Sequence, residues 1–432
     1  MDDRHWGFRT RALHAGSQPD PTTGARAVPI YQSTSFVFED TADAADLFAL
    51  QKYGTIYTRM SNPTNAVFEE RIASLEGGIG AVATASGQAA EFLTVTALAS
   101  AGEHIVAAAG LYGGTYTLFD VTLRRLGIDT TFVDGTDPDA FAAAVREDTK
   151  LLYTEIIANP SGAVADLAAL ADVARTHKLP LAVDSTFATP YLCRPLDHGA
   201  DIVLHSATKF LGGHGTSIGG VIVEAGRFDW DSGRFPHMTE RIPSYNELRW
   251  WDNFGEYAFC TKVRAEQLRD VGACLSPFNA FLLLQGIETL PLRMDAHVAN
   301  ARAVAEWLDA DDRVAWVLWA GLPDHPQHDL ARRYLPKGPG AIFTFGVVGG
   351  RAAGARFIES LQMVSHLANV GDAKTLVIHP ASTTHQQLSD AELEAGGVSP
   401  DMVRISVGLE DVDDIIWDLD QALTAATKDP DG

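Results

Sequence analysis

Lys209 has the surroundings in this sequence that best suit covalent chemistry. It lies in HSATKFLGGHG, directly after the apolar run DIVL, and Ser206 and Thr208 precede it. If HSAT continues the strand, alternation places the Ser206 and Thr208 side chains on one face and directs Lys209 to the other. Two hydroxyls could then hold a phosphate while the lysine reaches an aldehyde and forms a Schiff base. A lone lysine at a strand end, by contrast, is usually just solvated.

Three further segments carry groups that would complement such a lysine. Ser86, Gly87 and Gln88 begin a helix after AVATAS and could present N–H groups and a hydroxyl to an anion. Asp184 ends the run LAVD, where a buried carboxylate needs a cation such as a protonated pyridine nitrogen. Asn159 follows KLLYTEII and precedes a proline. Each segment alone has an ordinary explanation as a cap or turn, but together they supply what pyridoxal 5′-phosphate requires.

The pattern of apolar runs predicts the elements that position these residues. Between residues 62 and 225, short apolar runs alternate with stretches whose apolar residues recur at helical spacing. This alternation predicts an α/β fold with a mostly parallel seven-stranded sheet covered by helices. Ligands bind such sheets beyond the carboxyl ends of the strands, where the segments above lie. The runs are AVATAS, HIVAAAG, TTFVDG, KLLYTEII, LPLAVDST, DIVLHSA and GGVIVEAG.

Three regions with different patterns divide the chain of 432 residues, which is longer than one hydrophobic core usually supports. Residues 1–61 lack regular periodicity and predict an extended arm with a short helix near TADAADLFAL. Residues 62–260 form the predicted large domain, which ends in an aromatic, charged insertion from residue 228. Residues 261–432 predict a smaller α/β domain, because long helical stretches there alternate with VAWVLWAG, AIFTFGVVG, TLVIHP and VRISVGL.

Composition argues against several classes of partner and site. With 33 Lys and Arg against 56 Asp and Glu, the formal charge is −23, which disfavours nucleic acid and anionic membranes. The longest apolar stretches are too short to span a bilayer, and the N-terminus lacks the apolar run of a signal peptide. Three scattered cysteines suit neither a disulfide framework nor a zinc site, so no metal is expected. A cytoplasmic protein is therefore expected.

The sequence resembles the Cys/Met-metabolism family of fold-type I pyridoxal-phosphate enzymes, and within it the O-acetylhomoserine sulfhydrylases. The resemblance extends over nearly the whole chain and implies an aspartate aminotransferase-like fold. The matching segments are YTRMSNPT (57–64), ASGQAA (85–90), LYGGTY (111–116), AVDSTFATP (182–190), HSATKFLGGHG (205–215), SPFNAFLLLQGIETLPLRM (276–294), HPASTTH (379–385) and RISVGLED (404–411).

The resemblance implies a role for each matching residue. Lys209 would bind the cofactor covalently, Asp184 would pair with the pyridine nitrogen, and Tyr112 would stack on the ring and carry a proton. Asn159 would lie near the ring hydroxyl, and Arg404 would clamp the substrate carboxylate with its planar fork. The phosphate ligands would be Ser86, Gly87, Gln88, Ser206 and Thr208.

Tyr57 and Arg59 match the family's tyrosine–arginine pair, which reaches the cofactor phosphate of the neighbouring subunit. The resemblance therefore implies a homo-oligomer, at least a dimer and by analogy a tetramer. Without the resemblance to this family, Arg59 and Arg404 would be interpreted as ordinary surface cations.

Two departures separate the sequence from other branches of the family. Methionine γ-lyases carry a cysteine where this chain has Gly114, and cystathionine γ-lyases carry a glutamate where HLANVGD places Ala368 and Asn369. The sulfhydrylases share the LANVGD form and the aromatic insertion, and Asn369 is predicted to bind substrate. Neither departure identifies the acyl group of the substrate.

The implied reaction is a γ-replacement that converts O-acetylhomoserine and sulfide, or a thiol, into homocysteine, or methionine, and acetate. Lys209 would act first as base and then as acid, which requires a pKa near the working pH. O-succinylhomoserine sulfhydrylase, cystathionine γ-synthase and methionine γ-lyase are the alternatives within the family. A nicotinamide-dependent oxidoreductase should show G-x-G-x-x-G after the first strand, which ASGQAA does not match. A non-catalytic relative should have lost the lysine or its phosphate ligands.

Overall fold

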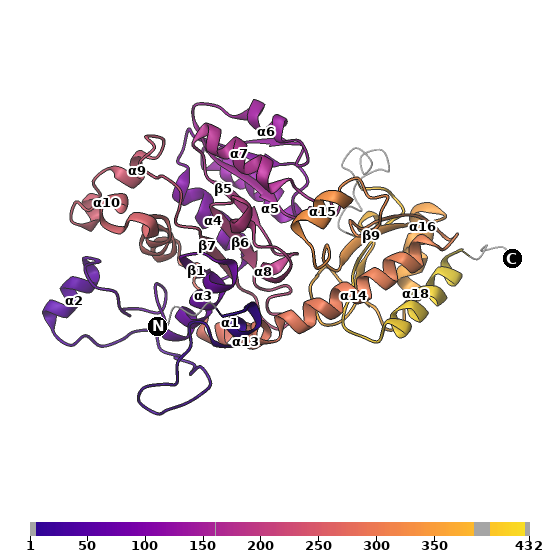
Figure 1. The fold of residues 1–432 in the computed structure, drawn as a ribbon, viewed down its shortest axis with the longest axis horizontal. Coiled ribbons are helices and arrows are strands. Elements are labelled where there is room, and N and C mark those ends of the chain that lie inside the picture. The colour runs from indigo at the N-terminus through magenta and orange to yellow at the C-terminus, as the bar shows by residue number, and fades with distance from the viewer. Residues whose placement is uncertain (1–5, 160, 384–397, 428–432) are drawn as a thin grey trace.

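The computed structural model describes residues 6–159, 161–383 and 398–427. Two bodies, each built on a sheet, lie side by side, and an N-terminal arm extends from the larger one (Figure 1). Thr384 and His385 of the HPASTTH segment, and the first five residues of the predicted arm, lie outside the described residues.

A seven-stranded sheet forms the larger body, as the apolar runs predict. Its strand order is β1-β7-β6-β5-β4-β2-β3, in which β7 is antiparallel to both of its neighbours and all other pairs are parallel. Central strands are buried on both faces, which explains their nearly continuous apolar sequences. The strands are β1 Gly80–Thr84, β2 His104–Ala108, β3 Asp129–Val133, β4 Thr149–Glu155, β5 Leu181–Asp184, β6 Ile202–Ser206 and β7 Gly220–Glu224.

Helices that cover this sheet begin at recognisable capping residues. Asn62, Ser86, Asp137 and Asp166 each accept a backbone N–H at the start of a helix through the side-chain oxygen. The helix expected over TYTLFDVTLRRLG is interrupted by a π-helical turn at Leu118–Leu123. The helices are α3 Pro63–Glu76, α4 Gly87–Leu98, α5 Gly113–Thr117, α6 Pro138–Ala144, α7 Leu167–His177 and α8 Thr189–Leu192.

The aromatic insertion folds into short helices around buried rings. Trp230, Phe235, Trp250 and Phe259 are almost fully buried, which accounts for the aromatic composition of a segment without periodicity. Glu224 at the end of β7 accepts the Cys260 N–H at 2.8 Å and thereby fixes the segment to the sheet. Its elements are α9 Pro236–Thr239, α10 Trp250–Phe254, α11 Ala258–Lys262, the π-helical turn Val263–Leu268 and α12 Arg269–Val271.

A five-stranded sheet of order β10-β11-β12-β9-β8 forms the smaller body, antiparallel except between β10 and β11. Helix α13 packs on α3 of the larger body, and α14 continues from there to the smaller one (Figure 1). The divisions at residues 61 and 260 stay predictions. The elements are α13 Pro277–Glu288, α14 Leu290–Asp309, β8 Val314–Leu318, α15 His328–Tyr334, β9 Ile342–Val347, α16 Gly350–Ser360, β10 Ser365–His366, β11 Leu376–Ile378, β12 Met402–Ser406 and α18 Val412–Thr427.

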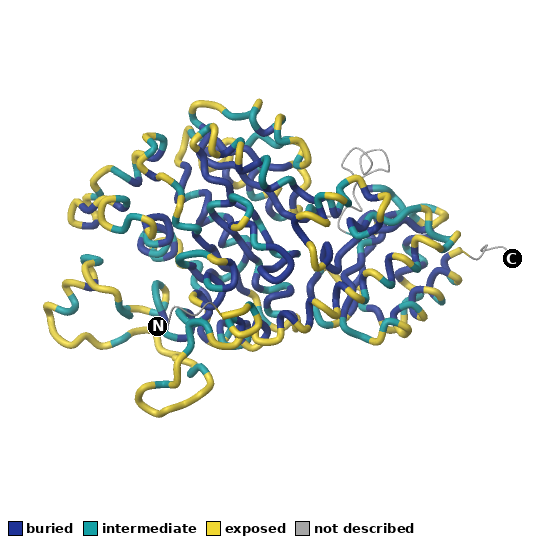
Figure 2. Tube along the Cα trace, in the orientation of Figure 1, coloured by how far each residue is buried: buried dark blue, intermediate teal, exposed yellow. Residues whose placement is uncertain are grey.

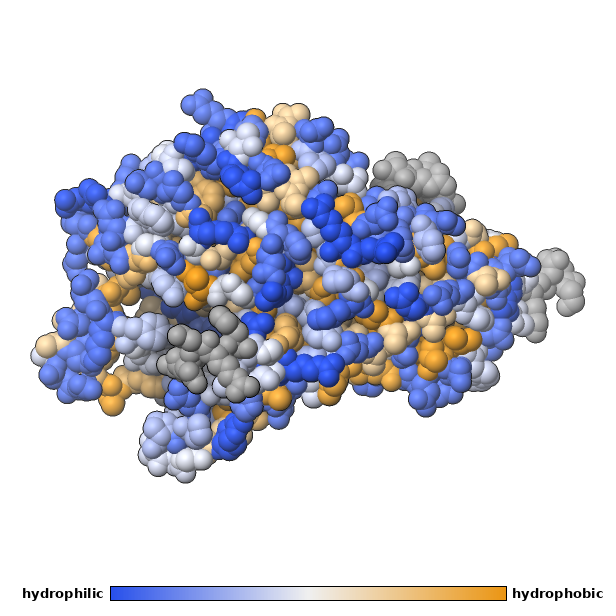
Figure 3. Space-filling model, in the orientation of Figure 1, coloured by the Kyte–Doolittle hydropathy of each residue, from blue (hydrophilic) through white to orange (hydrophobic). Residues whose placement is uncertain are grey.

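The N-terminal arm contains α1 Phe8–His14 and α2 Thr41–Phe48, the latter at the predicted position. Most of the arm is exposed, whereas the buried residues gather in the two sheets (Figure 2). A cavity of about 2010 Å³ lies between the arm and the larger body, and the space-filling view shows the molecule hollowed there (Figure 3). No helix in the described ranges has both the length and the apolar composition needed to cross a membrane.

Candidate active site

Lys209 lies in a turn that follows β6. The strand ends at Ser206, and Ala207–Phe210 form the turn, in which the Lys209 N–H donates to the Ser206 carbonyl at 3.2 Å. The expected strand alternation through Thr208 is therefore wrong. Hydrogen bonds within the turn replace the strand ladder, since the Gly212 N–H donates to the Ala207 carbonyl at 2.9 Å and the Gly213 N–H to the Lys209 carbonyl at 2.7 Å. Thr208 stays beside β7, because its N–H and hydroxyl both donate to the Gly219 carbonyl, at 3.3 and 3.2 Å.

The amine of Lys209 reaches across to the smaller body. Its Nζ donates a hydrogen bond to Oδ1 of Asn369, which lies between β10 and β11. Burial, and then the positive charge of Arg404, lower the pKa of Lys209 to about 8. A large share of the amine is therefore neutral near that pH, the form that reacts with a carbonyl group.

Arg404 is brought to the same place by the smaller sheet. It lies in the middle of β12, and its Nη1 donates to Oδ1 of Asn159 in the loop after β4, at 3.3 Å. Burial lowers the pKa of Arg404 while the nearby Tyr112 raises it. Arg404 is thus a half-buried cation in contact with the larger body and not the surface cation that sequence position alone would suggest.

Tyr112 is held through its backbone by a residue that sequence reasoning missed. Its N–H donates to Oε1 of Glu155 at 2.6 Å, and the N–H of Asn159 donates to the same carboxyl group. The Tyr112 ring is 51% exposed and so remains accessible to a ligand. Glu155 ends β4 beside Asp184 of β5. In the sequence Glu155 interrupts the run KLLYTEII, and a carboxylate within an apolar run is the signal that could have identified it.

Three buried carboxyl groups gather behind this site. Burial raises the pKa of Asp184, of Glu155 and of Glu91, the last to about 8. Glu91 lies on α4 and accepts hydrogen bonds from Thr115 at 2.8 Å and Tyr153 at 3.1 Å. Asp184 accepts the Thr186 N–H at 2.7 Å, and within the described residues no ion pair places a cation against it. A cation placed against Asp184 would relieve the cost of its burial.

The N-terminus of α4 forms a cradle with Ser206. Ser86 accepts the Ala89 N–H at 3.1 Å, so the N–H groups of Gly87 and Gln88 have no acceptor within the helix. A Cβ added to Gly87 would lie 2.7 Å from Cβ of Ser206, so only glycine allows this approach. The Gln88 side chain donates to Glu91 at 2.7 Å, and its backbone N–H, in the first turn of the helix, can still donate to a ligand. Such N–H groups with an adjacent hydroxyl suit a phosphate.

Tyr57 and Arg59 are the predicted site residues that the protomer does not bring to this cluster. Both side chains are exposed, and neither forms a hydrogen bond or ion pair with another predicted site residue in the described part of the chain. The Arg59 guanidinium instead lies over the Tyr57 ring, 5.5 Å from its centroid.

Gly114 lies against the ring of Tyr112. A Cβ added at this position would be 2.5 Å from Cε1 of Tyr112 and 3.2 Å from Cδ1 and Cζ. A side chain here would displace the ring from its present position. A cysteine at position 114, as in the methionine γ-lyases, would therefore not be compatible with the present position of the Tyr112 ring.

The residues present fit pyridoxal phosphate. They provide a phosphate cradle at α4, a buried carboxyl group that lacks a cation, and a lysine amine with a lowered pKa. These are the groups that the phosphate, ring nitrogen and aldehyde of the cofactor require. Within the described ranges, no group of three or more His, Cys, Asp or Glu side chains could hold a metal ion.

Comparisons with known proteins agree with this chemistry. The family model described as Cys/Met metabolism PLP-dependent enzyme matches residues 9–424. An O-acetyl-L-homoserine sulfhydrylase of Leptospira meyeri is 51% identical, with 97% of each chain covered, and a sulfhydrylase of Fusarium oxysporum is 53% identical, with 97% of this chain and 98% of that one covered.

A solved structure gives the same result for the fold. The O-acetylhomoserine (thiol)-lyase of Campylobacter jejuni, which contains a lysine joined to pyridoxyl phosphate, superposes with a TM-score of 0.94 at 37% identity, over 97% of this chain and all of that one. This chain therefore has the fold-type I architecture and belongs to the Cys/Met-metabolism family of pyridoxal-phosphate-dependent enzymes.

Proposed function

We propose that this enzyme is an O-acetylhomoserine sulfhydrylase, which replaces the acetoxy group at Cγ by sulfide to give homocysteine and acetate. The observation that carries the proposal is the hydrogen bond between the Lys209 amine and Asn369. Arg404 lies close enough to this amine for the positive charge of Arg404 to lower the pKa of Lys209. Asn369 lies in the LANVGD stretch that the sulfhydrylases share. The Leptospira meyeri relative bears this activity in its name.

The cofactor would be held by residues of the larger body. Lys209 would bind it covalently, Asp184 would face the ring nitrogen, Tyr112 the ring, and Asn159 the ring hydroxyl. When bound, pyridoxal phosphate stabilises negative charge at the substrate Cα. The proposed phosphate ligands are Ser86, Gly87, Gln88, Ser206 and Thr208, with Tyr57 and Arg59 from a neighbouring subunit.

The protein residues would bind the substrate and move its protons. Arg404 would bind the α-carboxylate, and its hydrogen bond to Asn159 would fix the direction of the fork. Lys209 would take the proton from Cα and return it, because a pKa of about 8 allows both directions near neutral pH. Asn369 would orient the freed amine of Lys209, and Tyr112 would act as a second proton carrier.

We propose a homo-oligomer, at least a dimer and most simply a tetramer, located in the cytoplasm. Exposure of Tyr57 and Arg59, away from the cluster of their own protomer, supports a site completed by another subunit. The described residues contain three free cysteines, as suits a reducing compartment.

Steady-state turnover tests the reaction. We expect O-acetylhomoserine with sulfide to give the highest kcat/KM among a panel that includes O-succinylhomoserine, cystathionine and methionine. O-acetylhomoserine with cysteine in place of sulfide tests for cystathionine γ-synthase, and methionine alone tests for methionine γ-lyase. A higher kcat/KM for cysteine as nucleophile, or for O-succinylhomoserine, cystathionine or methionine as substrate, would contradict the proposed reaction.

Borohydride reduction tests the position of the cofactor. Reduction should bleach the visible absorbance, and peptide mapping should find the pyridoxyl group on Lys209. Lys209→Ala should abolish turnover, because it removes both the anchor and the base. A pyridoxyl group on another lysine would refute the assignment of Lys209.

A further inference from the structure

A tight turn presents Tyr57 and Arg59 to the outside of the protomer. The carbonyl of Tyr57 accepts the N–H groups of Met60 and Ser61 at 2.9 and 3.1 Å, which closes the turn. Tyr57 also forms a bridge with Ser35 of the arm. The ring of Tyr57 is 42% exposed, and the Arg59 cation lies over it. The pair is thus organised before any partner contacts it.

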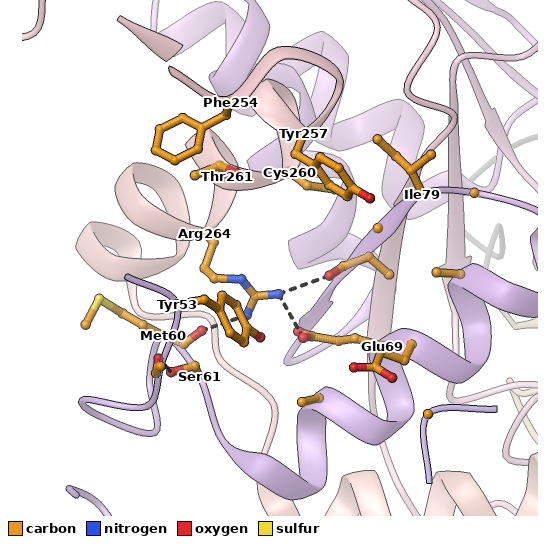
Figure 4. A pocket seen from close by; sticks show the side chains of 18 of the residues that line it. Tyr53, Met60, Ser61, Glu69, Ile79, Phe254, Tyr257, Cys260, Thr261 and Arg264 are labelled. Carbon is orange, nitrogen blue, oxygen red and sulfur yellow. Dashed lines mark hydrogen bonds and ion pairs between the residues drawn. The ribbon is translucent and has the colours of Figure 1, made fainter. Parts of the chain in front are cut away.

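Arg264 fixes this turn to the larger body. It lies in the π-helical turn Val263–Leu268, and its Nη1 donates to the Met60 carbonyl at 2.7 Å. Its Nη2 donates to Oε2 of Glu69 at 2.8 Å and to the Ala81 carbonyl at 3.0 Å. Figure 4 shows the guanidinium of Arg264 between Met60 and Glu69. One guanidinium therefore joins the arm, α3 and β1.

Glu69, the carboxylate partner of Arg264, is itself held by strand β1. Its Oε1 accepts the Ala83 N–H of β1 at 2.8 Å, and its side chain is only 8% exposed. Both charges are therefore paired, and each carboxylate oxygen has a donor. Strand β1 is followed directly by Ser86 at the start of α4. The same strand therefore supports both the turn that carries Tyr57 and Arg59 and the cradle expected to bind the phosphate.

We propose that Arg264 is a positioning residue that holds Tyr57 and Arg59 in place for the active site of the partner subunit. The proposal rests on the shared active site described under the proposed function. Arginine is required because three acceptors in different elements need the planar fork, which lysine cannot reproduce.

Mixed oligomers distinguish this role from a merely structural one. Arg264→Met alone should weaken cofactor binding by about tenfold or more, measured by fluorescence titration of the cofactor-free protein with pyridoxal phosphate. Mixed with Lys209→Ala chains, it should regain activity, because a mixed dimer has one site with an intact Lys209 and an intact neighbouring turn. Random exchange predicts about a quarter of wild-type activity, since half the dimers are mixed and each has one of two sites intact.

Two reference mixtures with Lys209→Ala and one single variant make the result interpretable. Arg59→Ala should be rescued to the same level. Asp184→Ala should not be rescued, because Asp184 belongs to the same half-site as Lys209. Arg269→Met removes an arginine that lines the same cavity and contacts Tyr245 and Asp270, and alone it should keep normal activity and cofactor affinity.

The outcomes separate the inference from the proposed function. Failure of Arg264→Met to be rescued, while Arg59→Ala is rescued, would overturn the positioning role and leave the shared site intact. Failure of both would refute the shared site and, with it, the inference. If Arg264→Met does not fold, Arg264→Lys provides the same test, because it keeps a cation beside Glu69 but loses the fork. Arg264→Lys should likewise regain activity when mixed with Lys209→Ala chains.

Discussion

Two neighbours, Arg404 and Asn369, affect the amine of Lys209 in different ways. Burial and the charge of Arg404 favour its neutral form, whereas the hydrogen bond to Asn369 orients it. Because the pKa lies near 8, the neutral fraction rises as the pH passes upward through that value. Arg404 thus acts on the reactivity of Lys209 as well as offering a site to a carboxylate.

A first prediction concerns the pH dependence of cofactor capture by Lys209. The rate at which cofactor-free protein binds pyridoxal phosphate, followed by visible absorbance, should rise with pH and level off above about pH 8. Arg404→Gln removes a positive charge, so the pKa of Lys209 should rise and the profile should move to higher pH. Arg404→Lys retains the charge and should leave the profile in place. An unmoved profile in Arg404→Gln would show that the charge has no influence.

A second prediction tests Arg404 as the carboxylate site. Loss of a charge-assisted bidentate contact of about 1.5–3 kcal/mol should raise the KM for O-acetylhomoserine by about one to two orders of magnitude in Arg404→Ala. Arg404→Lys should be impaired as well, because it lacks the fork. Visible absorbance should persist in both variants. An unchanged KM would mean that another group binds the carboxylate.

A third prediction concerns the fit between Gly114 and the Tyr112 ring. Gly114→Ala places a methyl group 2.5 Å from the ring, so the ring must move and kcat should fall by about tenfold or more. The circular dichroism of the bound cofactor should change with it. Gly113→Ala is the matched control, because a Cβ there meets nothing within 4 Å. Equal kcat in the two variants would show that the ring position does not limit turnover.

At the scale of elements, α14 holds the turn that carries Lys209. Arg293 lies on this helix and is buried, which lowers its pKa to about 10. Its guanidinium donates to the carbonyls of Phe210 at 2.8 Å, Gly286 at 2.6 Å and Leu211 at 3.3 Å. A helix that reaches into the smaller body therefore fixes the backbone next to the reactive lysine.

A fourth prediction follows for this helix. Arg293→Met leaves buried carbonyls without donors and should destabilise the protein by about 3 kcal/mol, seen as a lower midpoint of denaturant unfolding. Retention of the cofactor during gel filtration should weaken too, because the turn around Lys209 loses its anchor. Arg175→Met, at a largely exposed arginine paired with Asp172, should change stability by less than about 0.5 kcal/mol.

The elements were largely predictable because buried strands and capped helices leave local signals. Each of the seven apolar runs corresponds to a strand, and Ser86 and Asp184 lie at the expected ends. The end of β6 at Ser206 was not predictable, because the apolar run DIVLHSA continues past Ser206 without a turn residue. The π-helical turns likewise have no sequence signal, since packing against neighbouring elements produces them.

The residues of the candidate site were easier to predict than the contacts between them. Asn369 and Arg404 were assigned through resemblance, and only the folded chain shows that they meet Lys209 and Asn159. Such contacts join residues more than 150 positions apart, for which periodicity gives no information. Glu155 was overlooked because the apolar run KLLYTEII continues beyond it, whereas Asp184 ends the run LAVD.

At the scale of the whole molecule, the protomer brings some of the predicted site residues together and leaves two of them apart. Lys209, Asp184 and Arg404 lie within one cluster, whereas Tyr57 and Arg59 lie on an exposed arm. The arm also leaves Val37 98% exposed and Tyr53 79% exposed. Apolar side chains this exposed, beside a large cavity, are consistent with an arm that packs on another copy of the chain.

A fifth prediction is that activity depends on protein concentration. On dilution below the dissociation constant of the dimer, specific activity should fall while far-ultraviolet circular dichroism stays unchanged. Excess Lys209→Ala chains should restore it, because they supply Tyr57 and Arg59 without a working site of their own. Constant specific activity in samples shown to be monomeric by sedimentation would refute a shared site.

The contact between Met60 and Arg264 also has a consequence for the order of synthesis. The two residues are 204 positions apart, so the ribosome releases the arm long before the arginine that anchors it. All seven strands of the large sheet, which ends in sequence at Glu224, are made before Arg264 emerges. A nascent chain therefore cannot offer a fixed Tyr57–Arg59 turn to another subunit until its own large sheet is complete. The arm is made before the sheet of the larger body, but its contact with Arg264 can form only after all seven strands have been made.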